Sequence, residues 1–222
     1  MLTKEDVQKI NEKFKDSTAQ QLLAWFAQQY SPGRIALASS LGAEDQVLTD
    51  MLMTNTPDMR IFTLDTGRLP EETYDVMERT RGRYGLTYTM LFPEHRDIES
   101  ITAEQGPNLF YRSVDSRKLC CQIRKVKPLR RMLSHLDVWI CGLRRDQAVT
   151  RADVLRVEWD ETFGLIKLNP LADWSEQQVW DYIRTNNVPY NLLHDKGYPT
   201  IGCSPCTRAV ADLLLRPIGK WI

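Results

Sequence analysis

Residues 34–52 read RIALASSLGAEDQVLTDML, and this stretch decides the fold. Its first part, 34–38, is a short apolar run with the length of a buried strand, and Val47, Leu48, Met51 and Leu52 then recur at helical spacing. Helical patterns separate this run from three further short apolar runs, at 59–64, 87–91 and 138–141. Strands that alternate with helices predict an α/β protein, in which helices cover both faces of a twisted parallel sheet.

The composition narrows the class of protein. A chain of 222 residues with 42% hydrophobic residues has enough apolar surface for a core, which excludes a disordered or fibrous protein. Its 29 basic residues balance 29 acidic ones, so we expect no nucleic-acid partner and no attraction to anionic lipid. The charged N-terminus and the half-polar uncharged stretch 17–33 predict neither a secretion signal nor a membrane span, which favours a cytoplasmic protein.

The organisation of the chain is that of a single unit. Two helices are predicted before the first strand, at 4–15, where Thr3 and Asp6 form a weak capping box, and at 19–30. No internal repeat and no long Gly, Ser or Pro linker interrupts the sequence. We therefore expect one domain over 1–210, with 211–222 as the start of a C-terminal tail.

Three loops are expected at the end of the sheet where the strands have their carboxyl ends. Ligands of such folds bind there. They are SSLGAED at 39–45, LDTGRLP at 64–70, and GLRRDQ at 142–147 with Arg151 just beyond. Small residues let backbone amides approach an anion at a helix N-terminus, and guanidinium groups bind phosphate or sulfate bidentately. Each of the first two loops alone is equally typical of an ordinary strand-to-helix turn. Their convergence predicts an anion-binding edge.

The five cysteines form two pairs and a single residue. Cys120 and Cys121 lie in segment 112–131, which has eight basic residues and one acidic residue, while Cys203 and Cys206 form a CxxC and Cys141 stands alone. Four thiolates could hold zinc or an iron–sulfur cluster. Neighbouring side chains on a helix diverge by about 100°, so an adjacent pair suits a group with separated metal corners better than one ion. The alternative is that these cysteines are buried or form disulfides.

Six motifs carry a family resemblance: SSLGAED, LDTG, CCxxRK, GLRRDQ, NPLADW and YPTIGCSPCTR. Over about residues 20–210 the chain resembles the assimilatory sulfonucleotide reductases, in the branch with paired cysteines. The resemblance implies an adenine nucleotide alpha hydrolase-like fold, as in ATP pyrophosphatases. It also implies reduction of adenosine 5'-phosphosulfate (APS) to sulfite and AMP in cysteine biosynthesis. The alternatives are reduction of 3'-phosphoadenosine 5'-phosphosulfate (PAPS), and an ATP-using enzyme, whose SGGxDS pattern is lacking here.

The resemblance also assigns site residues. It implies one [4Fe–4S] cluster, next to Lys125, with the ligands Cys120, Cys121, Cys203 and Cys206. It places the substrate against Ser39, Ser40, Gly42, Leu64, Asp65, Thr66, Gly142, Arg145 and Arg151. His194 would lie near the cluster, although a structural histidine is an equal alternative.

The reaction that the resemblance implies uses a cysteine nucleophile and a thioredoxin or glutaredoxin-like reductant. The family's nucleophile lies in a C-terminal ECGLH-like motif, but no cysteine follows Cys206, and 216–222 resembles only the stretch that precedes that motif. We therefore expect either a nucleophile in a tail missing from this sequence or a protein that binds nucleotide and cluster without turnover. Cys141, at a strand end, is a substitute nucleophile or, more commonly, a buried thiol. Homo-oligomerisation is left open.

Overall fold

A computed structural model of the chain describes residues 2–209. Within them, six strands form one sheet in the order β3-β2-β1-β4-β6-β5. The strands are β1 (Ile35–Ala38), β2 (Arg60–Leu64), β3 (Thr89–Leu91), β4 (Val138–Ile140), β5 (Val157–Asp160) and β6 (Leu165–Leu168). All neighbours are parallel except β5, which runs antiparallel to β6 at the edge. The α/β prediction is confirmed, and the antiparallel edge strand is an addition to it.

Eight α-helices surround this sheet within the described residues. They are α1 (Lys4–Lys13), α2 (Ala19–Gln29), α3 (Ala43–Asn55), α4 (Glu71–Tyr84), α5 (His95–Gln105), α6 (Val114–Cys121), α7 (Lys127–Leu133) and α8 (Glu176–Thr185). The two N-terminal helices lie where the sequence predicts them, and the capping box at Thr3 is present, with its N–H 2.9 Å from Asp6 Oδ2. None of these helices is long and apolar enough to cross a membrane.

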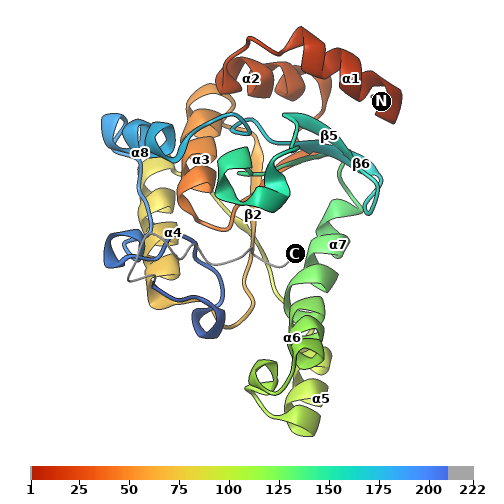
Figure 1. Cartoon of the computed structure of the whole chain (residues 1–222), viewed down its shortest axis with the longest axis vertical. Coiled ribbons are helices and arrows are strands. Elements are labelled where there is room, and N and C mark those ends of the chain that lie inside the picture. Colours follow the sequence, from red (N-terminus) through yellow and green to blue (C-terminus); the bar gives the residue numbers. More distant parts are fainter. Residues whose placement is uncertain (1, 210–222) are drawn as a thin grey trace.

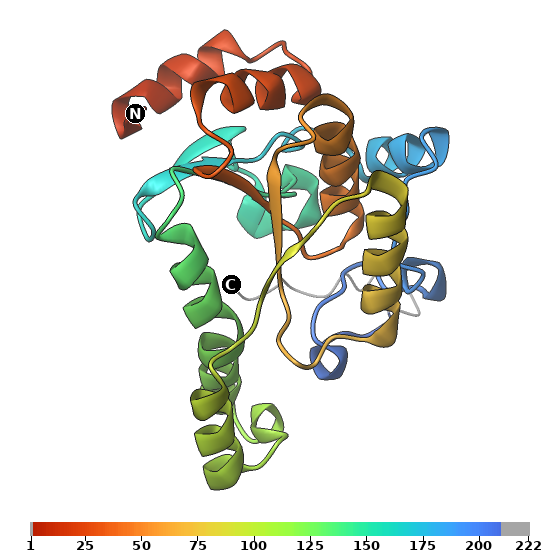
Figure 2. The same cartoon turned by 180° about the vertical axis from the view of Figure 1, so that it is seen from behind.

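Helices cover both faces of the sheet, as the apolar runs predict (Figures 1 and 2). In β1, Ile35 and Leu37 are buried in the larger core with residues of α1–α4 and α8, while Ala36 between them belongs to a second core. That second core lies under α7 and includes Leu129 and Leu133. Successive side chains of a strand point to opposite faces, so both sets are apolar only if both faces are buried.

The edge strand β5 is covered by α1. The Asn11 side chain makes the hydrogen bonds that a further strand would make. Its Nδ2 donates to Val157 O at 2.8 Å, and its Oδ1 accepts from Val157 N at 3.1 Å. Arg156 adds bonds to the α1–α2 turn, donating to Phe14 O at 2.7 Å and Ser17 O at 2.8 Å. Covering an exposed edge in this way blocks pairing with another chain.

An arm built from α5, α6 and α7 extends away from the sheet (Figure 1). Its own small core contains Ile101, Leu109 and Ile123. A π-helical turn, Gln122–Val126, joins α6 to α7, directly after Cys120 and Cys121. Such turns occur often at functional sites, because the extra residue redirects the side chains on either side. The single domain over 1–210 stays a prediction, and the expected tail at 211–222 lies outside the described residues.

Candidate active site

The β1–α3 loop is held by Asp45. Asp45 Oδ2 accepts hydrogen bonds from Ser40 N and Ser40 Oγ, both at 2.6 Å, and Ser39 Oγ accepts from Leu41 N at 3.1 Å. Leu41 has a φ of 61°, which is uncommon for a residue with a side chain, and its side chain is fully buried in the larger core. Burial of Leu41 therefore offsets the strain of the loop. Gly42 is the N-cap of α3, so this helix begins directly after the loop, as the sequence predicts.

Gly142 brings the end of β4 against the N-terminus of α3. A Cβ at this position would lie 2.4 Å from Asp45 Oδ1 and 2.9 Å from Glu44 Cβ, so only glycine fits. The neighbouring Arg144 is 6% exposed and pairs with Glu44, with Nε 3.0 Å from Oε1. The loops at 39–45 and 142–147, which the sequence places at one sheet edge, are in contact. The requirement for glycine here comes from packing.

The β2 loop is fixed by its own carboxylate. Asp65 accepts hydrogen bonds from Gly67 N at 2.7 Å and from Tyr74 OH at 3.1 and 3.0 Å. Burial raises the pKa of Tyr74 to about 12, and the hydrogen bond to Asp65 adds to the shift. Gly67 has a φ of 69°, which favours glycine. Asp65 therefore shapes the loop that carries Leu64 and Thr66.

Thr66 connects this loop to both cysteine segments. Its Oγ1 lies 3.2 Å from Cys203 Sγ, and its carbonyl oxygen accepts from Arg124 NH1 at 2.6 Å. Arg124 is buried and belongs to the π-helical turn beside the cysteine pair. A further bond joins Ser204 N to Arg68 O at 2.8 Å. The structure thus brings together segments that are about 80 residues apart in the sequence.

All four paired cysteines are free thiols that lie close enough to affect one another's charge. Burial raises the pKa of Cys120 and of Cys121, the charges of Arg124 and Lys125 respectively lower it, and negative charge on Cys203 or Cys206 raises it again. Among the described residues, no three His, Cys, Asp or Glu side chains are grouped closely enough for a metal ion. Four thiols from two facing segments fit a group with four separated metal corners better than one ion.

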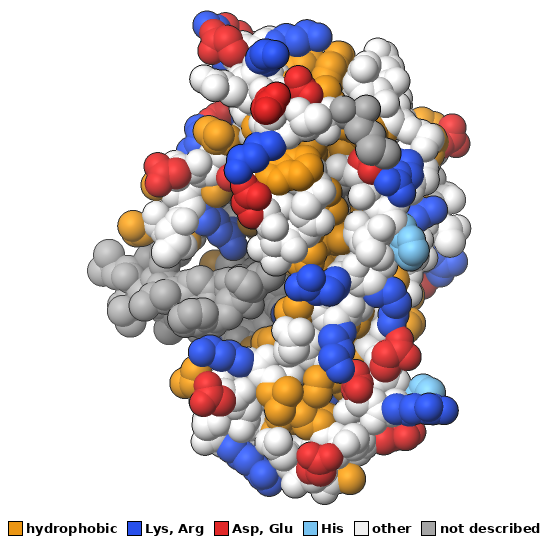
Figure 3. Space-filling model, turned by 90° about the vertical axis from the view of Figure 1, so that its right-hand side faces the viewer, with side chains coloured by type: hydrophobic (Ala, Val, Ile, Leu, Met, Phe, Trp, Pro, Cys, Tyr) orange, Lys and Arg blue, Asp and Glu red, His pale blue; other side chains and the backbone are white. Residues whose placement is uncertain are grey.

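Basic side chains surround the cysteine pairs. Lys125 reaches the second pair, since a Cβ built on Gly202 would lie 3.9 Å from its Nζ. Along the arm, Arg112, Arg117, Lys118 and Arg130 are exposed. Figure 3, which views the molecule from the arm side, shows Lys and Arg side chains along this face. Acidic side chains lie among them, so the positive charge next to the cysteines themselves is that of Arg117, Arg124 and Lys125, which lowers the thiol pKa values.

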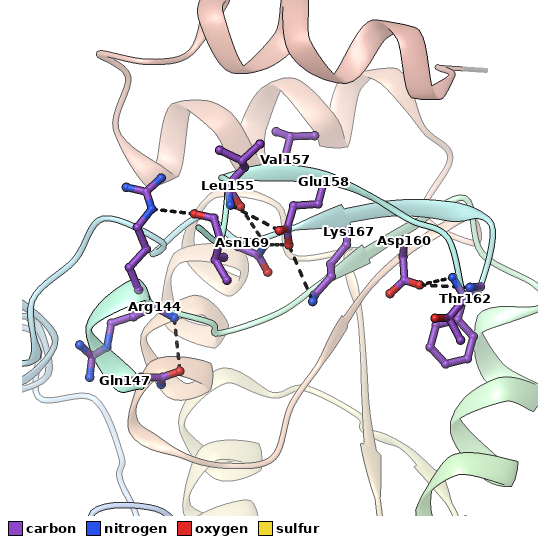
Figure 4. Close-up of polar contacts among 12 residues, drawn as sticks. Arg144, Gln147, Leu155, Val157, Glu158, Asp160, Thr162, Lys167 and Asn169 are labelled. Carbon is purple, nitrogen blue, oxygen red and sulfur yellow. Dashed lines mark hydrogen bonds and ion pairs between the residues drawn. The ribbon is translucent and has the colours of Figure 1, made fainter. Parts of the chain in front are cut away.

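Arg145 and Arg151 already form hydrogen bonds and an ion pair with other residues of the chain. Arg145 Nε donates to Val154 O at 2.7 Å, and its guanidinium pairs with Asp173. Arg151 donates to Gln147 Oε1, and burial lowers its pKa. Figure 4 shows Arg144 N–H donating to the same Gln147 side chain, at 3.3 Å. An anion that binds Arg145 would have to compete with Asp173.

An apolar surface lies between these loops on the α7 face of the sheet. Ala38, Leu64, Leu91 and Leu143 are only partly buried there and pack against the second core, which contains Trp139 and Cys141. We call these four residues the apolar floor. Ala38, Leu64 and Leu91 are the last residues of β1, β2 and β3, and Leu143 follows β4, so this apolar surface lies at the carboxyl ends of the strands and suits a flat, largely apolar ring.

The structure favours one of the two roles that the sequence left open for Cys141 and for His194. Burial raises the pKa of the Cys141 thiol well above its ordinary value, so it is protonated at neutral pH, which disfavours the substitute nucleophile. His194 Nδ1 lies 2.8 Å from Tyr198 O, and its ring packs edge-on against Trp180 with centroids 5.2 Å apart. These contacts favour the structural role for His194.

The sequence motifs did not reveal Asp45, Arg124 and Tyr74 as residues that position this site. Asp45 had one signal, its place in the first turn of a helix after a Ser-rich loop, which is typical of a capping carboxylate. Arg124 had none, because its partner Thr66 lies 58 residues away, and Tyr74, nine residues after Asp65, had none because no motif includes it.

Known proteins are similar to this chain in sequence and in fold. The Phosphoadenosine phosphosulfate reductase domain model matches residues 34–209. "Adenosine 5'-phosphosulfate reductase" of Allochromatium vinosum is 48% identical over 187 residues, which cover 84% of this chain and 73% of that protein. The protein of the same name from Burkholderia cepacia is 44% identical over 200 residues, covering 90% and 79%.

Solved structures agree with that match. The phosphoadenylyl-sulfate (PAPS) reductase of Candida auris, crystallised as a phosphate complex, superposes with a TM-score of 0.81 at 26% identity and covers 94% of this chain and 98% of that one. The FMN adenylyltransferase of Candida glabrata, in complex with ATP, shares the fold alone, with a TM-score of 0.56 at 15% identity over 90% of this chain and 62% of that one. Because the family model matches residues 34–209 and these relatives are 48% and 44% identical over most of the chain, the chain belongs to the phosphoadenosine phosphosulfate reductase domain family.

Proposed function

We propose that this protein is an oxidoreductase that reduces adenosine 5'-phosphosulfate to sulfite and AMP in sulfate assimilation. One observation carries the proposal: two cysteine pairs and the β1, β2 and β4 loops meet at one sheet edge, connected through Thr66 and Gly142. The 48% and 44% identical relatives bear the name of this activity, which supports the choice of substrate.

The residues at the carboxyl ends of β1, β2 and β4 have the chemistry that such a substrate needs. The apolar floor suits the adenine ring, and the amides of the β1 loop and α3 suit an anion. Lys125 suits the sulfuryl end, because its ammonium lies beside Gly202. Among the described residues, Lys125 forms no ion pair with a carboxylate, whereas Lys127 and Arg131 do. A cation there stabilises the charge that builds up when an anionic thiolate approaches an anionic sulfuryl group.

The proposed reaction has three steps. A cysteine thiolate attacks the sulfur of the phosphosulfate, the bond from that sulfur to the phosphate oxygen breaks, and AMP leaves with the electron pair. A dithiol reductant of the thioredoxin or glutaredoxin type then attacks the cysteine sulfur of the S-sulfocysteine. Sulfite leaves with the electron pair of the sulfur–sulfur bond, and the reductant is then joined to the enzyme cysteine in a mixed disulfide. The second thiol of the reductant attacks this mixed disulfide, which frees the enzyme thiolate and leaves the reductant as a disulfide.

The same proposal includes one [4Fe–4S] cluster, held by Cys120, Cys121, Cys203 and Cys206. When bound, the cluster would supply a fixed anionic scaffold, against which the basic residues of the arm are held. The free thiols, their mutual electrostatic effect and the neighbouring Lys125 support this assignment. A cytoplasmic location, where thiols stay reduced, agrees with it.

The cluster is tested by anaerobic purification of the chain and of two variants. We expect about four iron and four sulfide per chain, with brown colour, in the unmodified protein. Cys121→Ser should lose the iron, whereas the matched control Cys141→Ser should keep it, because Cys141 lies in the second core. A metal-free or zinc-only preparation of the unmodified protein would contradict the assignment.

The activity is tested by sulfite release from APS with thioredoxin, compared with PAPS. A second candidate is nucleotide and cluster binding without turnover, which the burial of Cys141 and the raised pKa of its thiol favour. A fusion of the chain with an extension that carries ECGLH separates the two. Sulfite release by the fusion alone would support the reductase with an added nucleophile, and AMP binding without sulfite release by either protein would support the second candidate.

A further inference from the structure

An ion pair on the β5–β6 edge lies on the same face of the sheet as the apolar floor and has no role in the proposal so far. Trp139, Lys167 and Glu158 are directly opposite one another in register on β4, β6 and β5. Register neighbours share one face of a sheet, so all three side chains lie on the α7 face. In Figure 4 the Lys167 side chain points away from α1 and α2, opposite to Val157, which is buried in the larger core.

Glu158 is held in a fixed position by its neighbours. Its Oε2 accepts from Asn169 Nδ2 at 2.7 Å, and its Oε1 accepts from Leu155 N at 3.4 Å. Asn169 is fully buried, and the same Nδ2 also donates to Leu155 O at 2.9 Å. The carboxylate therefore cannot follow Lys167 if that side chain moves toward a ligand.

The Lys167 ammonium is only loosely engaged. Its Nζ lies 3.8 Å from Glu158 Oε2, which is too long for a hydrogen bond. The side chain is 21% exposed, so it is accessible to a ligand. An ammonium has three N–H donors, which are available here to an anionic acceptor.

Lys167 also borders the apolar floor. Its Nζ lies 5.7 Å from the centroid of the Trp139 ring, and Trp139 packs in the second core with the floor residues. Burial raises the pKa of Cys141, and the charge of Lys167 is the largest effect that opposes this rise, so the ammonium is also near Cys141. Cys141 precedes Gly142, which is in contact with the nucleotide-type loop at 39–45.

We propose that Lys167 binds the phosphate group of an adenine nucleotide from the β6 side of the apolar floor, and that the carboxylate of Glu158 opposes this attraction. This inference rests on the nucleotide site of the proposed function. A cation next to the Trp139 ring acts where water is partly excluded, so its attraction for phosphate is stronger than in open solvent. Neutralising Lys167 must then weaken binding, while neutralising Glu158 must strengthen it.

The test is calorimetric binding of AMP and of adenosine to the full chain at two salt concentrations. We expect Lys167→Met to weaken AMP binding about tenfold and to reduce its dependence on salt, with adenosine binding unchanged. Glu158→Gln should tighten AMP binding about threefold, because the opposing charge is removed while a side-chain oxygen still accepts from Asn169. Lys167→Arg should retain most of the affinity.

A second pair provides the matched control. Lys4 and Glu161 also form a Lys–Glu pair that involves the β5–β6 hairpin, but both side chains are 67% exposed and Lys4 lies on α1. Lys4→Met and Glu161→Gln should leave AMP binding unchanged. Unfolding temperatures, measured for every variant, show whether a loss of binding follows a loss of structure.

Four results would overturn the inference. If Lys167→Met and Glu158→Gln both weaken AMP binding, the pair is merely structural. If Lys167→Met weakens adenosine and AMP equally, the contact is not with phosphate. If the unmodified chain binds AMP and Lys167→Met binds it equally well, the inference fails while the nucleotide site stands. Absence of AMP binding by the unmodified chain would remove both. Should Lys167→Met not fold, Glu158→Gln and Lys167→Arg still decide the question.

Discussion

Replacing Gly142 by alanine tests how the nucleotide-type loops are joined. The new Cβ would lie 2.4 Å from Asp45 Oδ1, 2.9 Å from Glu44 Cβ and 3.2 Å from Asp45 N. The carboxylate would have to move by about 1 Å to reach ordinary contact distance, and the close-packed interior resists this movement. Asp45 cannot move without lengthening its two 2.6 Å hydrogen bonds from Ser40.

The size of the effect follows from these contacts. Overpacking costs about 1–3 kcal/mol, and weakening hydrogen bonds to a charged group adds to it, so we expect a loss of about 3 kcal/mol in unfolding free energy. For a domain of this size that corresponds to a fall in melting temperature of roughly 6–12 °C. AMP binding should weaken as well, because the β1 loop loses the carboxylate that holds it.

The assay is thermal unfolding followed by circular dichroism, together with AMP calorimetry below the transition. Gly33→Ala is the matched control, since nothing lies within 4 Å of a Cβ at that position and its melting temperature should barely change. If Gly142→Ala melted within about 1 °C of the unmodified protein and bound AMP equally well, then the packing of β4 against α3 would not be what requires glycine here.

Further predictions concern buried polar groups. Tyr84 and Tyr182 each donate a 2.7 Å hydrogen bond to the buried Asp50, so Tyr84→Phe and Tyr182→Phe should each cost about 1–3 kcal/mol in urea denaturation, and losses near zero would refute this. Because the pKa of Tyr74 is raised from 10.0 to about 12, its contribution to stability is present below pH 10 and declines as the pH rises to 12; Tyr74→Phe should flatten this decline. Iodoacetamide at pH 8 should label Cys141 only in urea, since burial keeps the thiol protonated, and rapid labelling of the folded protein would contradict this.

The sequence by itself determined four of the parallel strands, β1 to β4, and the carboxyl ends at which the site lies. The apolar run at 34–38 and the small residues after it predicted β1, the loop and the start of α3, because strand length, turn residues and helix caps are local properties. The two cysteine pairs were equally visible, and the adjacency of Cys120 and Cys121 indicated a group with several metal corners, which stays a prediction.

Only the tertiary structure decided how these parts are joined. β5 (VEWD) and β6 (LIKL) were not predicted, because Glu158, Asp160 and Lys167 interrupt their apolar residues. These strands gain their order from pairing with β4 and from the cover of α1. Likewise, the bond from Arg124 to Thr66 and the contact of Gly142 with Asp45 join residues 58 and 97 positions apart. Such contacts depend on how whole faces pack together, and no local pattern encodes that, which is why the loops were predicted and the residues that hold them were found in the fold.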